Sequence, residues 1–428
     1  MDFPIKTNLS DQLKQALTPN QNQLLQVVAG EAMRLHMPLY IVGGLVRDLL
    51  LGHPGSDFDL VVEGDAVILA REVAARHGGT VRVHPRFKTA QWFPQKASGN
   101  TKFIDLITAR SESYKHPAAL PSIRPGTLKD DLRRRDFTIN TLALRVDNDH
   151  FGDLVDELGG GKDLKAGLVR VLHPVSFEDD PTRMFRAARY EQRYGFKIEP
   201  LTLGLIPEAC AQVRLVSAQR IRRELELILG EENSAPMLKR LADLGVLRAV
   251  HPALDFTRSA RLRFKRALAN MGNIKNLPSR LTLYWSLWLM DVPPSGLRSI
   301  DRRLHFEARL REDLLAASRL FAEGDSLPGK KTSECVARLD NFPDRAVQAV
   351  AMGLPAGKPR QVLIDYLATW RNVRPKTSGH DLKKRGLAPG PVYKSILGRL
   401  RDARLDGEIR TNEDEMRLLE KLISDKKR

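Results

Sequence analysis

The feature that most constrains this chain is a pair of glycines that stands between two short apolar runs. Residues 38–42 (PLYIV) are apolar and end directly in Gly43-Gly44, which is typical of a strand that runs into a tight turn. Residues 45–51 then suit one or two helical turns, and residues 58–62 form a second apolar run. We therefore predict a strand, a glycine turn, a short helix and a second strand.

Two aspartates stand at the start of that second strand. Asp57 and Asp59 are two positions apart, and side chains alternate across a strand, so both carboxylates point to the same side. They repel each other unless a cation lies between them, and Mg²⁺ commonly takes one or two protein carboxylates together with phosphate oxygens. Two such ions activate a hydroxyl group and stabilise a pyrophosphate leaving group. An isolated Asp-x-Asp pair is more often a solvated turn, so the interpretation depends on its neighbours.

The neighbouring residues favour a phosphate substrate. Gly43 and Gly44 allow close approach to the backbone, and N–H groups at a helix start bind phosphate. Arg47 can add charge-assisted hydrogen bonds to a triphosphate. Asp105 lies in the apolar run 103–107, where a carboxylate is costly unless it is paired or metal-bound. It is therefore either a third metal ligand or a strand-edge residue that faces solvent.

The chain is strongly basic, with 69 lysines and arginines against 52 aspartates and glutamates and a net charge of +17. Such an excess favours a polyanionic partner, because lysines and arginines that neutralise phosphates release counterions. Aromatic residues make up only 6%, which argues against a surface built mainly for base stacking. Cys210 and Cys335 form neither a disulfide framework nor a zinc site. The sequence has no membrane-span or signal-peptide pattern, so we expect a cytoplasmic protein without membrane contact.

The remaining pattern predicts a mixed α/β head followed by helices. A helix is expected over 66–77, and strands are expected around 80–83, 89–93 and 103–108. Residues 111–126 contain three prolines and no clear periodicity, which predicts a functional loop. From Ser176 onward nearly everything is expected to be helical, including 183–194, 218–229, 236–244, 258–269 and 360–373.

Five blocks in a fixed order make the sequence resemble the class II tRNA nucleotidyltransferases and bacterial poly(A) polymerases. The resemblance is strong over residues 38–230 and weaker over 379–409. The blocks are 43–59, 131–140 (DLRRRDFTIN), 156–160 (DELGG), 179–189 (DDPTRMFRAAR) and the tail motifs 379–382, 386–391 and 405–408. The first block implies that Asp57 and Asp59 bind Mg²⁺ and that Gly44 and Arg47 contact the incoming nucleotide.

In the second block the resemblance implies contacts to the ribose and triphosphate of the nucleotide. We expect Arg134, Arg135, Asp136 and Asn140 to make them, because arginines beside an aspartate can hold phosphate and ribose together. The third block, 156–160, resembles the family's hinge between head and neck, and its glycines suit a joint.

The fourth block resembles the protein template that reads the nucleotide base. An aspartate accepts a hydrogen bond from an exocyclic amino group, and an arginine donates to ring nitrogens or a carbonyl. We expect Asp180 and Arg183, three positions apart on one helix, to read the base, steadied by Arg186 and Arg189. Ser176 is expected to cap that helix.

Basic residues gather in two further places. In the tail the resemblance implies a module that grips folded tRNA, and a solvated basic face is the alternative. Its basic residues are Lys383, Lys384, Arg385, Lys394, Arg399 and Arg401. A second cluster, within 258–266, is equally consistent with RNA backbone contact and with simple solvation.

The resemblance implies template-independent addition of CCA to the 3′ end of tRNA from CTP and ATP, with release of pyrophosphate and with Mg²⁺ as cofactor. The alternatives are a partial enzyme that adds only the terminal A or only CC, a poly(A) polymerase, and an RNA-binding protein without activity. The 111–126 loop disfavours CC-only addition and is expected to switch specificity between C and A. The common family form has Glu-Asp where this chain has Asp179-Asp180, a form shared by CCA-adding and A-adding members.

The expected fold class is α+β, with a nucleotidyltransferase head of mixed β-sheet and helices over residues 1–155. An elongated all-α part is expected to follow. It would divide into a neck for base recognition (156–235), a body for RNA binding (236–375) and a tRNA-binding tail (376–428). The sequence predicts no particular oligomeric state.

Overall fold

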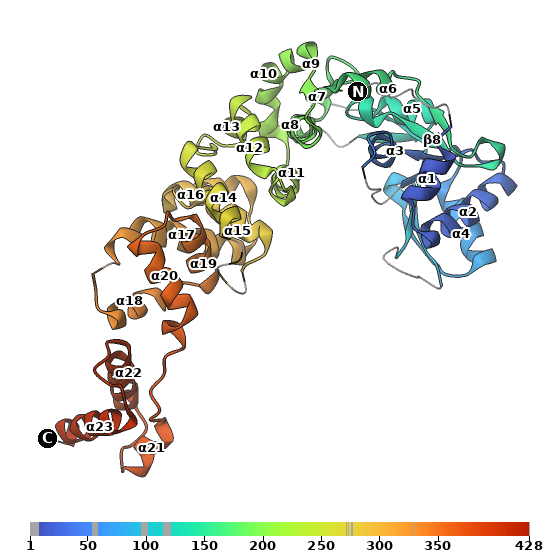
Figure 1. The fold of residues 1–428 in the computed structure, drawn as a ribbon. Coiled ribbons are helices and arrows are strands. Elements are labelled where there is room, and N and C mark those ends of the chain that lie inside the picture. The colour runs from blue at the N-terminus through green and yellow to red at the C-terminus, as the bar shows by residue number, and fades with distance from the viewer. Residues whose placement is uncertain are drawn as a thin grey trace. The chain divides into compact units, whose positions relative to one another are not determined.

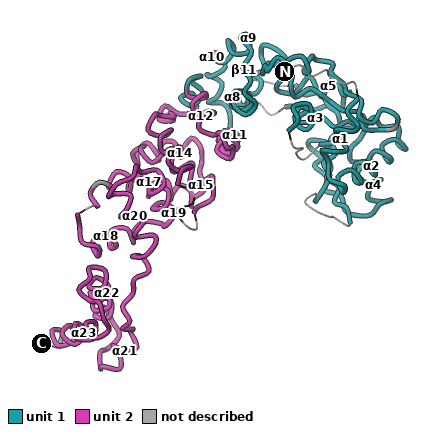
Figure 2. Tube along the Cα trace, in the orientation of Figure 1, with its two compact units in different colours: residues 1–220, 243–249 teal, residues 221–242, 250–428 magenta. Residues whose placement is uncertain are grey.

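The structure is a computed structural model that describes residues 8–53, 59–95, 102–113, 121–270, 272, 274, 277–327 and 329–427. It divides into two compact units (Figure 2). Unit 1 contains residues 1–220 and 243–249, and unit 2 contains residues 221–242 and 250–428.

Unit 1 is built on a seven-stranded mixed sheet with the strand order β3-β4-β5-β2-β1-β8-β9. Figure 1 shows β8 of this sheet together with helices of unit 1. The strands are β1 (Leu39–Val42), β2 (Asp59–Val62), β3 (Thr80–His84), β4 (Thr89–Phe93), β5 (Ile104–Thr108), β8 (Ala143–Arg145) and β9 (Asp153–Val155). β2 and β5 are parallel neighbours, whereas the other five pairs of neighbours are antiparallel. The mixed sheet confirms the α+β class predicted for the head.

Helices cover both faces of this sheet. They are α1 (Ser10–Ala16), α2 (Pro19–Arg34), α3 (Gly44–Leu50), α4 (Ala66–His77), α5 (Leu128–Arg133) and the 3₁₀ turns η1 (Pro85–Phe87), η2 (Thr138–Asn140) and η3 (Asn148–His150). α4 packs against β3, β4 and β5, and α2 packs against α4. Leu128 and Leu132 of α5 pack in one buried cluster with Val61 of β2.

The helix predicted over 66–77 is confirmed with the same bounds. Asp65 caps it, since its carboxylate accepts hydrogen bonds from the N–H groups of Val67 (2.8 Å) and Ile68 (3.2 Å). Gly78 follows it with a φ of 76°, a backbone conformation that favours glycine. The capping side chain and the glycine stop were both readable in the sequence, which is why this helix was predicted well.

The segment 111–126 differs from its prediction. Its two flanks form an antiparallel hairpin of β6 (Arg110–Ser113) and β7 (Ser122–Pro125), and residues 114–120 lie outside the described residues. The strands were missed because neither flank is apolar, so period-two alternation is absent from the sequence. The expectation of a loop therefore concerns only the residues between the two strands.

The rest of unit 1 is mostly helical. Its elements are α6 (Gly160–Ala166), β10 (Leu168–Val169), α7 (Ser176–Asp179), α8 (Thr182–Tyr194), β11 (Lys197–Ile198), α9 (Pro200–Gly204), α10 (Ile206–Ala209) and η4 (Cys210–Leu215). β10 and β11 pair in parallel, so the segment expected to be all helical contains a two-stranded ladder. α11 (Ala218–Gly230), α12 (Ser234–Asp243) and α13 (Val246–Val250) cross the boundary between the units.

Unit 2 is helical wherever the structure assigns regular elements to its described residues. The elements are α14 (Arg258–Ala269), α15 (Arg280–Leu289), α16 (Pro294–Leu304), α17 (Ala308–Glu323), η5 (Gly324–Ser326), α18 (Thr332–Leu339), α19 (Asp344–Gly353), α20 (Lys358–Ala368), η6 (Trp370–Asn372), α21 (Gly379–Lys384), α22 (Pro391–Leu405) and α23 (Asn412–Lys427). Trp285 and Trp288 of α15 stack at 5.2 Å in the core. Within the described residues, every helix is too short or too polar to cross a membrane.

α6 begins at a tightly packed glycine. Asp156 caps this helix start, because its carboxylate accepts hydrogen bonds from the N–H groups of Gly160 (2.7 Å) and Gly161 (2.9 Å). A Cβ atom on Gly160 would stand 2.3 Å from the carbonyl oxygen of Thr138, so backbone would have to move. The third sequence block therefore fixes α6 against η2.

We expect Gly160→Ala to destabilise unit 1 by roughly 1–3 kcal/mol, because the added methyl group overlaps a backbone oxygen. Gly30 is the matched control: it lies in the exposed interior of α2 and has no heavy atom within 4 Å of an added Cβ. Gly30→Ala should stabilise by roughly 0.5–1 kcal/mol through helix propensity. Urea unfolding followed by circular dichroism measures both changes, and equal stabilities for the two variants would contradict the packing argument.

Candidate active site

A row of polar side chains crosses four neighbouring strands of the sheet in unit 1, from β3 to β2. Arg82 of β3 pairs in register with Gln91 of β4, Gln91 pairs with Asp105 of β5, and Asp105 pairs with Asp59 of β2. Residues that pair in register point to the same face of a sheet. Gln91 Nε2 donates a 2.9 Å hydrogen bond to Asp105 Oδ1. The two aspartates, 46 positions apart in the sequence, are therefore neighbours on one face.

The same face changes from polar to apolar within one strand. Val61 lies two residues after Asp59, so it shares that face, and it is fully buried under Leu132 of α5. Asp59 is exposed and Asp105 is half-buried. The helix thus covers the apolar part of the face and leaves the carboxylates accessible. Asp105 lies on an interior strand of the sheet, which removes the strand-edge alternative for this residue.

This donor set has the chemistry of a magnesium site. Hard carboxylate oxygens on one rigid face suit Mg²⁺, which needs few protein ligands. The described residues contain no group of three or more His, Cys, Asp or Glu side chains that could hold a metal ion. Asp57, which the sequence analysis pairs with Asp59, lies outside those residues.

The glycine turn lies between β1 and α3 and is flanked by two guanidinium groups. Gly43 has a φ of 85°, which favours glycine, and no side chain caps α3. A Cβ atom on Gly43 would stand 2.7 Å from Arg135 Nη1, and one on Gly44 would stand 3.6 Å from Arg47 Nη2. Arg135 Nε is buried without a hydrogen-bond partner in the described structure. Two cations and an unused donor beside an uncapped turn are what a phosphate group needs.

Arg47 is itself deeply buried, with 3% of its surface exposed. Its guanidinium donates to Asn140 Oδ1 and to Asp48 Oδ1, the latter at 2.8 Å from Nη2. The rings of Tyr190 and Tyr194 flank it, with centroids at 5.0 and 4.7 Å. The structure therefore places Arg47 at the predicted turn but surrounds it with protein groups.

The second block forms a buried ionic network. Asp131 is fully buried and accepts hydrogen bonds from Arg134 Nη2 (2.6 Å) and Arg135 Nη2 (2.9 Å). Burial alone would raise the pKa of Asp131, but the two guanidinium groups outweigh it and lower the pKa. Arg134 also pairs with Glu112 of β6 at 3.2 Å, which ties the hairpin to this block. Glu112 carries no signal in the sequence.

Asp136 is the buried centre that joins the second and fourth blocks. Its Oδ1 accepts a hydrogen bond from Asn140 Nδ2 (2.8 Å), and its Oδ2 accepts one from Arg186 Nε (2.6 Å). Burial would raise the pKa of Asp136, but the charge of Arg186 and these hydrogen bonds outweigh burial and lower the pKa to about 2. Asp136 is therefore an anion at neutral pH, and its carboxylate fixes α8 against η2.

The fourth block does not form one continuous helix. Asp180 has an extended backbone (φ −140°, ψ 93°) between α7 and α8, so the prediction that it shares a helix with Arg183 is wrong. Its carboxylate accepts from the Thr182 N–H at 3.0 Å and pairs with Arg220 at 2.7 Å. Pro181 holds the capping position of α8, and the residue before a proline disfavours helical dihedrals. The Asp180 carboxylate therefore lies outside the helix and accepts a hydrogen bond from its first N–H group.

Ser176 and Arg183 also differ from their predicted arrangement. Ser176 is the first residue of α7, whose capping position is Val175, so the predicted Ser176 cap is wrong. The Ser176 hydroxyl instead accepts a hydrogen bond from Arg183 Nη1, and Arg183 Nη2 donates to the Arg134 carbonyl oxygen at 2.9 Å. Arg189 is buried and lies over the Tyr190 ring at 5.5 Å. The arginines of α8 are thus held in place by other residues of unit 1.

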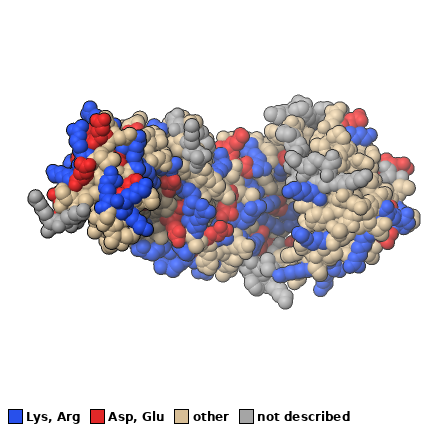
Figure 3. Space-filling model, turned by 90° about the horizontal axis from the view of Figure 1, so that it is seen from below, with Lys and Arg blue, Asp and Glu red and all other residues tan. Residues whose placement is uncertain are grey.

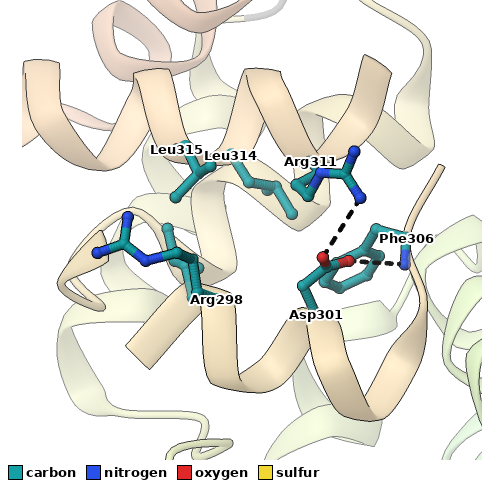
Figure 4. Close-up of a pocket in the computed structure, with 7 residues that line it drawn as sticks. Arg298, Asp301, Phe306, Arg311, Leu314 and Leu315 are labelled. Atoms are coloured by element: carbon teal, nitrogen blue, oxygen red, sulfur yellow. Dashed lines mark hydrogen bonds and ion pairs between the residues drawn. The ribbon is translucent and has the colours of Figure 1, made fainter. Parts of the chain in front are cut away.

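One cavity in unit 2 lies apart from the sequence motifs. One small hollow lies between α16 and α17 and is lined by Leu297, Arg298, Asp301, Phe306, Arg311, Leu314 and Leu315 (Figure 4). Arg311 and Asp301 form a 3.5 Å ion pair there, and Asp301 Oδ1 accepts a 3.0 Å hydrogen bond from the Phe306 N–H. These interactions join two helices, which indicates a packing role.

Basic side chains are spread over one face of the protein and are interspersed with acidic ones (Figure 3). Several arginines of the two basic clusters are paired with other groups of the chain. Arg263 is 1% exposed and donates to the carbonyl oxygen of Leu287. In the tail, Arg401 pairs with Asp340 at 2.5 Å and Arg399 with Glu408 at 2.5 Å. The high net charge therefore overstates the number of cations available to a polyanion.

Comparison with known proteins agrees with this fold. Residues 39–170 match the family described as the Poly A polymerase head domain, and residues 195–257 match the probable RNA and SrmB-binding site of polymerase A. The head on the mixed sheet is thus that of a nucleotidyltransferase. The A-adding tRNA nucleotidyltransferase of Halalkalibacterium halodurans is 32% identical over 98% of this chain and 96% of its own length. The chain therefore belongs to the tRNA nucleotidyltransferase family.

Two further relatives extend the comparison. The A-adding tRNA nucleotidyltransferase of Geobacter sulfurreducens is 34% identical over 91% of this chain, which spans only 45% of that relative's length. A solved structure of the Thermotoga maritima CCA-adding enzyme complexed with tRNA superimposes with a TM-score of 0.79. It is 28% identical and covers 98% of both chains. Relatives of both kinds therefore align along nearly the whole sequence.

We expect Asp136→Asn to reduce the free energy of unfolding of unit 1 by on the order of 2–3 kcal/mol at pH 7, because Arg186 loses its buried counter-charge. The folded-state pKa of about 2 lies below the ordinary value of 3.8. The charge therefore stabilises fully above that ordinary value, and its contribution is lost as the pH falls toward 2. Urea unfolding across that range should show the deficit of Asp136→Asn shrinking with acid. Asp11→Asn, at an exposed position, is the control, and a deficit independent of pH would contradict a role for the charge.

Proposed function

We propose that this chain adds CCA to the 3′ ends of tRNA, using CTP and ATP and releasing pyrophosphate. One juxtaposition carries the proposal. In unit 1 the carboxylate face of β2 and β5, the glycine turn with Arg135, and helix α8 with its buried arginines belong to one compact body. A carboxylate face suits metal-assisted phosphoryl chemistry, and the arginines beside the turn suit a triphosphate.

The metal-binding residues in this proposal are Asp57 and Asp59, with Asp105 as a third ligand. Mg²⁺ bound there would supply Lewis-acid activation of the RNA 3′-hydroxyl and charge stabilisation of the leaving pyrophosphate. The protein's own contribution is rigidity, since the β2–β5 ladder holds Asp59 beside Asp105 and Gln91 orients the Asp105 carboxylate. Preorganised ligands of this kind need no rearrangement when the substrate binds.

Triphosphate and ribose are assigned to the glycine turn and the second block. Gly43, Gly44 and Arg135 would hold the phosphates, with Arg134 and Arg47 nearby. Asn140 and Asp136 would stand closest to the ribose. Arg134 and Arg135 keep their place because the buried Asp131 binds both. These contacts serve CTP and ATP alike, because they involve no base atoms.

Base selection is assigned to α8 and the residue before it. Asp180 and Arg183 would present an acceptor and donors to the base edge, with Arg186 and Arg189 as support. Arg183 is already held by the Ser176 hydroxyl and the Arg134 carbonyl oxygen. The same arginine thus touches the backbone of the triphosphate block, which joins base selection to phosphate placement. The neck, body and tail (156–235, 236–375 and 376–428) would carry base reading and tRNA binding.

A second candidate function is addition of the terminal A alone. The observation that favours it is the A-adding relative at 32% identity over nearly the full length of both chains. Both functions include AMP transfer to tRNA that ends in CC, so the use of CTP separates them. A poly(A) polymerase would instead extend oligo(A) without a defined end.

The deciding experiment uses purified protein with tRNAs that lack CCA, that end in C, or that end in CC, each with CTP or ATP alone. A CCA-adding enzyme extends the first two with CTP and the third with ATP. An A-adding enzyme extends only the third. Gel mobility of the tRNA reports each addition, and failure to extend any of the three would refute nucleotidyl transfer to tRNA.

We expect Asp59→Ala and Asp57→Ala to reduce incorporation by at least about 10³-fold, because metal-dependent charge stabilisation is lost. Binding of tRNA, measured by filter retention, should change little. Asp11→Asn is the control for a surface carboxylate in the same unit. Incorporation that survives either alanine variant would show that the metal assignment is wrong.

Replacement of residues 114–120 by a short glycine-serine linker should disturb the switch between CTP and ATP, because these residues join the two strands of the hairpin that Glu112 ties to Arg134. We expect the ratio of C to A incorporation to change while binding of CCA-lacking tRNA is retained. The matched control is Glu112→Gln, which weakens the ion pair but keeps the linker. An unchanged ratio in the linker variant would exclude a role for the loop in specificity.

A further inference from the structure

Two tyrosines of α8 enclose the guanidinium group of Arg47. The ring centroids of Tyr190 and Tyr194 lie 5.0 and 4.7 Å from it, and the two rings stack with an interplanar angle of 28°. Cations over aromatic faces are attracted to the ring electrons, and the attraction grows when water is excluded. With 3% of its surface exposed, Arg47 meets that condition.

Tyr194 makes further contacts to the same segment of the chain. Its hydroxyl donates a 2.9 Å hydrogen bond to Asp48 Oδ1, and Asp48 is also the ion-pair partner of Arg47. Its ring lies 5.9 Å from that of His53. Burial raises the pKa of Tyr194 to about 12, so the hydroxyl remains a neutral donor at the pH of any cellular reaction. One side chain thus contacts the middle of α3 and the residue a few positions beyond its end.

The contacted segment lies between the two parts of the proposed site. α3 begins at the glycine turn, and Arg47 Nη2 is the side-chain atom nearest to an added Cβ on Gly44. After His53 the chain continues to Asp57 and Asp59. A residue that fixes α3 therefore acts on the glycine turn at its start.

Arg47 also belongs to a closed ring of interactions. It donates to Asn140, Asn140 donates to Asp136, Asp136 accepts from Arg186, and Arg186 Nη2 donates to the Tyr190 hydroxyl at 3.3 Å. The Tyr190 ring then returns to Arg47. Tyr190 is therefore tied directly to a residue assigned to base reading. Tyr194 contacts Arg47, Asp48 and His53 of the α3 segment and meets this ring of interactions through Arg47 and through its stacking on Tyr190.

We propose that Tyr194, together with Tyr190, is a positioning residue that clamps Arg47 and α3 and so sets the affinity for the nucleotide triphosphate, whichever base it carries. The inference rests on the proposed function and deepens it, since it assigns substrate affinity to residues outside the five sequence blocks. The clamp acts through Arg47 and the glycine turn, so it affects phosphate binding equally for CTP and ATP. A contribution to base reading would instead favour one nucleotide over the other.

The test compares Tyr194→Leu with Tyr194→Phe. The leucine variant removes the ring, and we expect the KM for each nucleotide that the wild-type protein uses to rise about tenfold, with kcat changed less than about threefold. The phenylalanine variant keeps the ring and loses only the bond to Asp48, so its KM should rise less than about threefold. Phe196→Leu is the matched control, because Phe196 lies two residues after the end of α8 and its ring centroid is 5.5 Å from that of Tyr194.

Several results would overturn the clamp. They are an unchanged KM in Tyr194→Leu, equal KM values in the leucine and phenylalanine variants, a change confined to kcat, and a change as large in Phe196→Leu. If the leucine variant does not fold, a large KM rise in Tyr194→Phe still contradicts the proposal, since the ring is intact there. A wild-type protein that adds no nucleotide to any tRNA would instead refute the proposed function, so the two failures are distinguishable.

Discussion

The buried carboxylate of Asp136 holds together the parts of unit 1 on which the proposed chemistry depends. It accepts hydrogen bonds from Asn140, four residues later in the chain, and from Arg186 on α8. Asn140 in turn accepts a hydrogen bond from Arg47, which follows the glycine turn. Because the carboxylate is buried, breaking its bonds to Asn140 and Arg186 would leave an unpaired charge away from water, which costs a large part of the stability. This charge thereby fixes the head to the helix assigned to base reading, together with the bonds from Arg183 to the Arg134 carbonyl oxygen and from Tyr194 to Asp48. This explains why three blocks far apart in the sequence form one body.

The outline of the fold could be predicted because its signals are local. The apolar runs, the Asp65 cap and the Gly78 stop each specify a strand or a helix end within a few residues. The β6–β7 hairpin could not be predicted, since polar strands lack alternation and Glu112 is recognisable only through its contact with Arg134. The break at Asp180 was readable in the Pro181 that follows, and the resemblance to a helical motif obscured it.

The residues of the candidate site also fall into two groups, those that the sequence indicates and those that only the folded structure reveals. Asp59 and Asp105 were proposed from the chemistry of carboxylates on a strand, and the arginines of the second and fourth blocks from the resemblance to the family. Gln91 was missed, because its partner Asp105 lies on a neighbouring strand and only the register brings them together. The same holds for Tyr190 and Tyr194, which pattern analysis cannot distinguish from ordinary core aromatics. Residues that act on other residues leave little trace in a single sequence.

The parallel pairing of β2 and β5 determines how the chain is routed. Between these strands the chain makes an excursion through α4, β3 and β4, and the β3–β4 hairpin lies at the edge of the sheet. The register of Asp59 against Asp105 is set by the direct β2–β5 ladder and not by the length of that excursion. The hairpin turn at 85–88 is also exposed. A relative of this protein can therefore carry an insertion at that turn without a change in the register that places Asp59 beside Asp105. The edge of the sheet is thus the part of the head that best tolerates insertions.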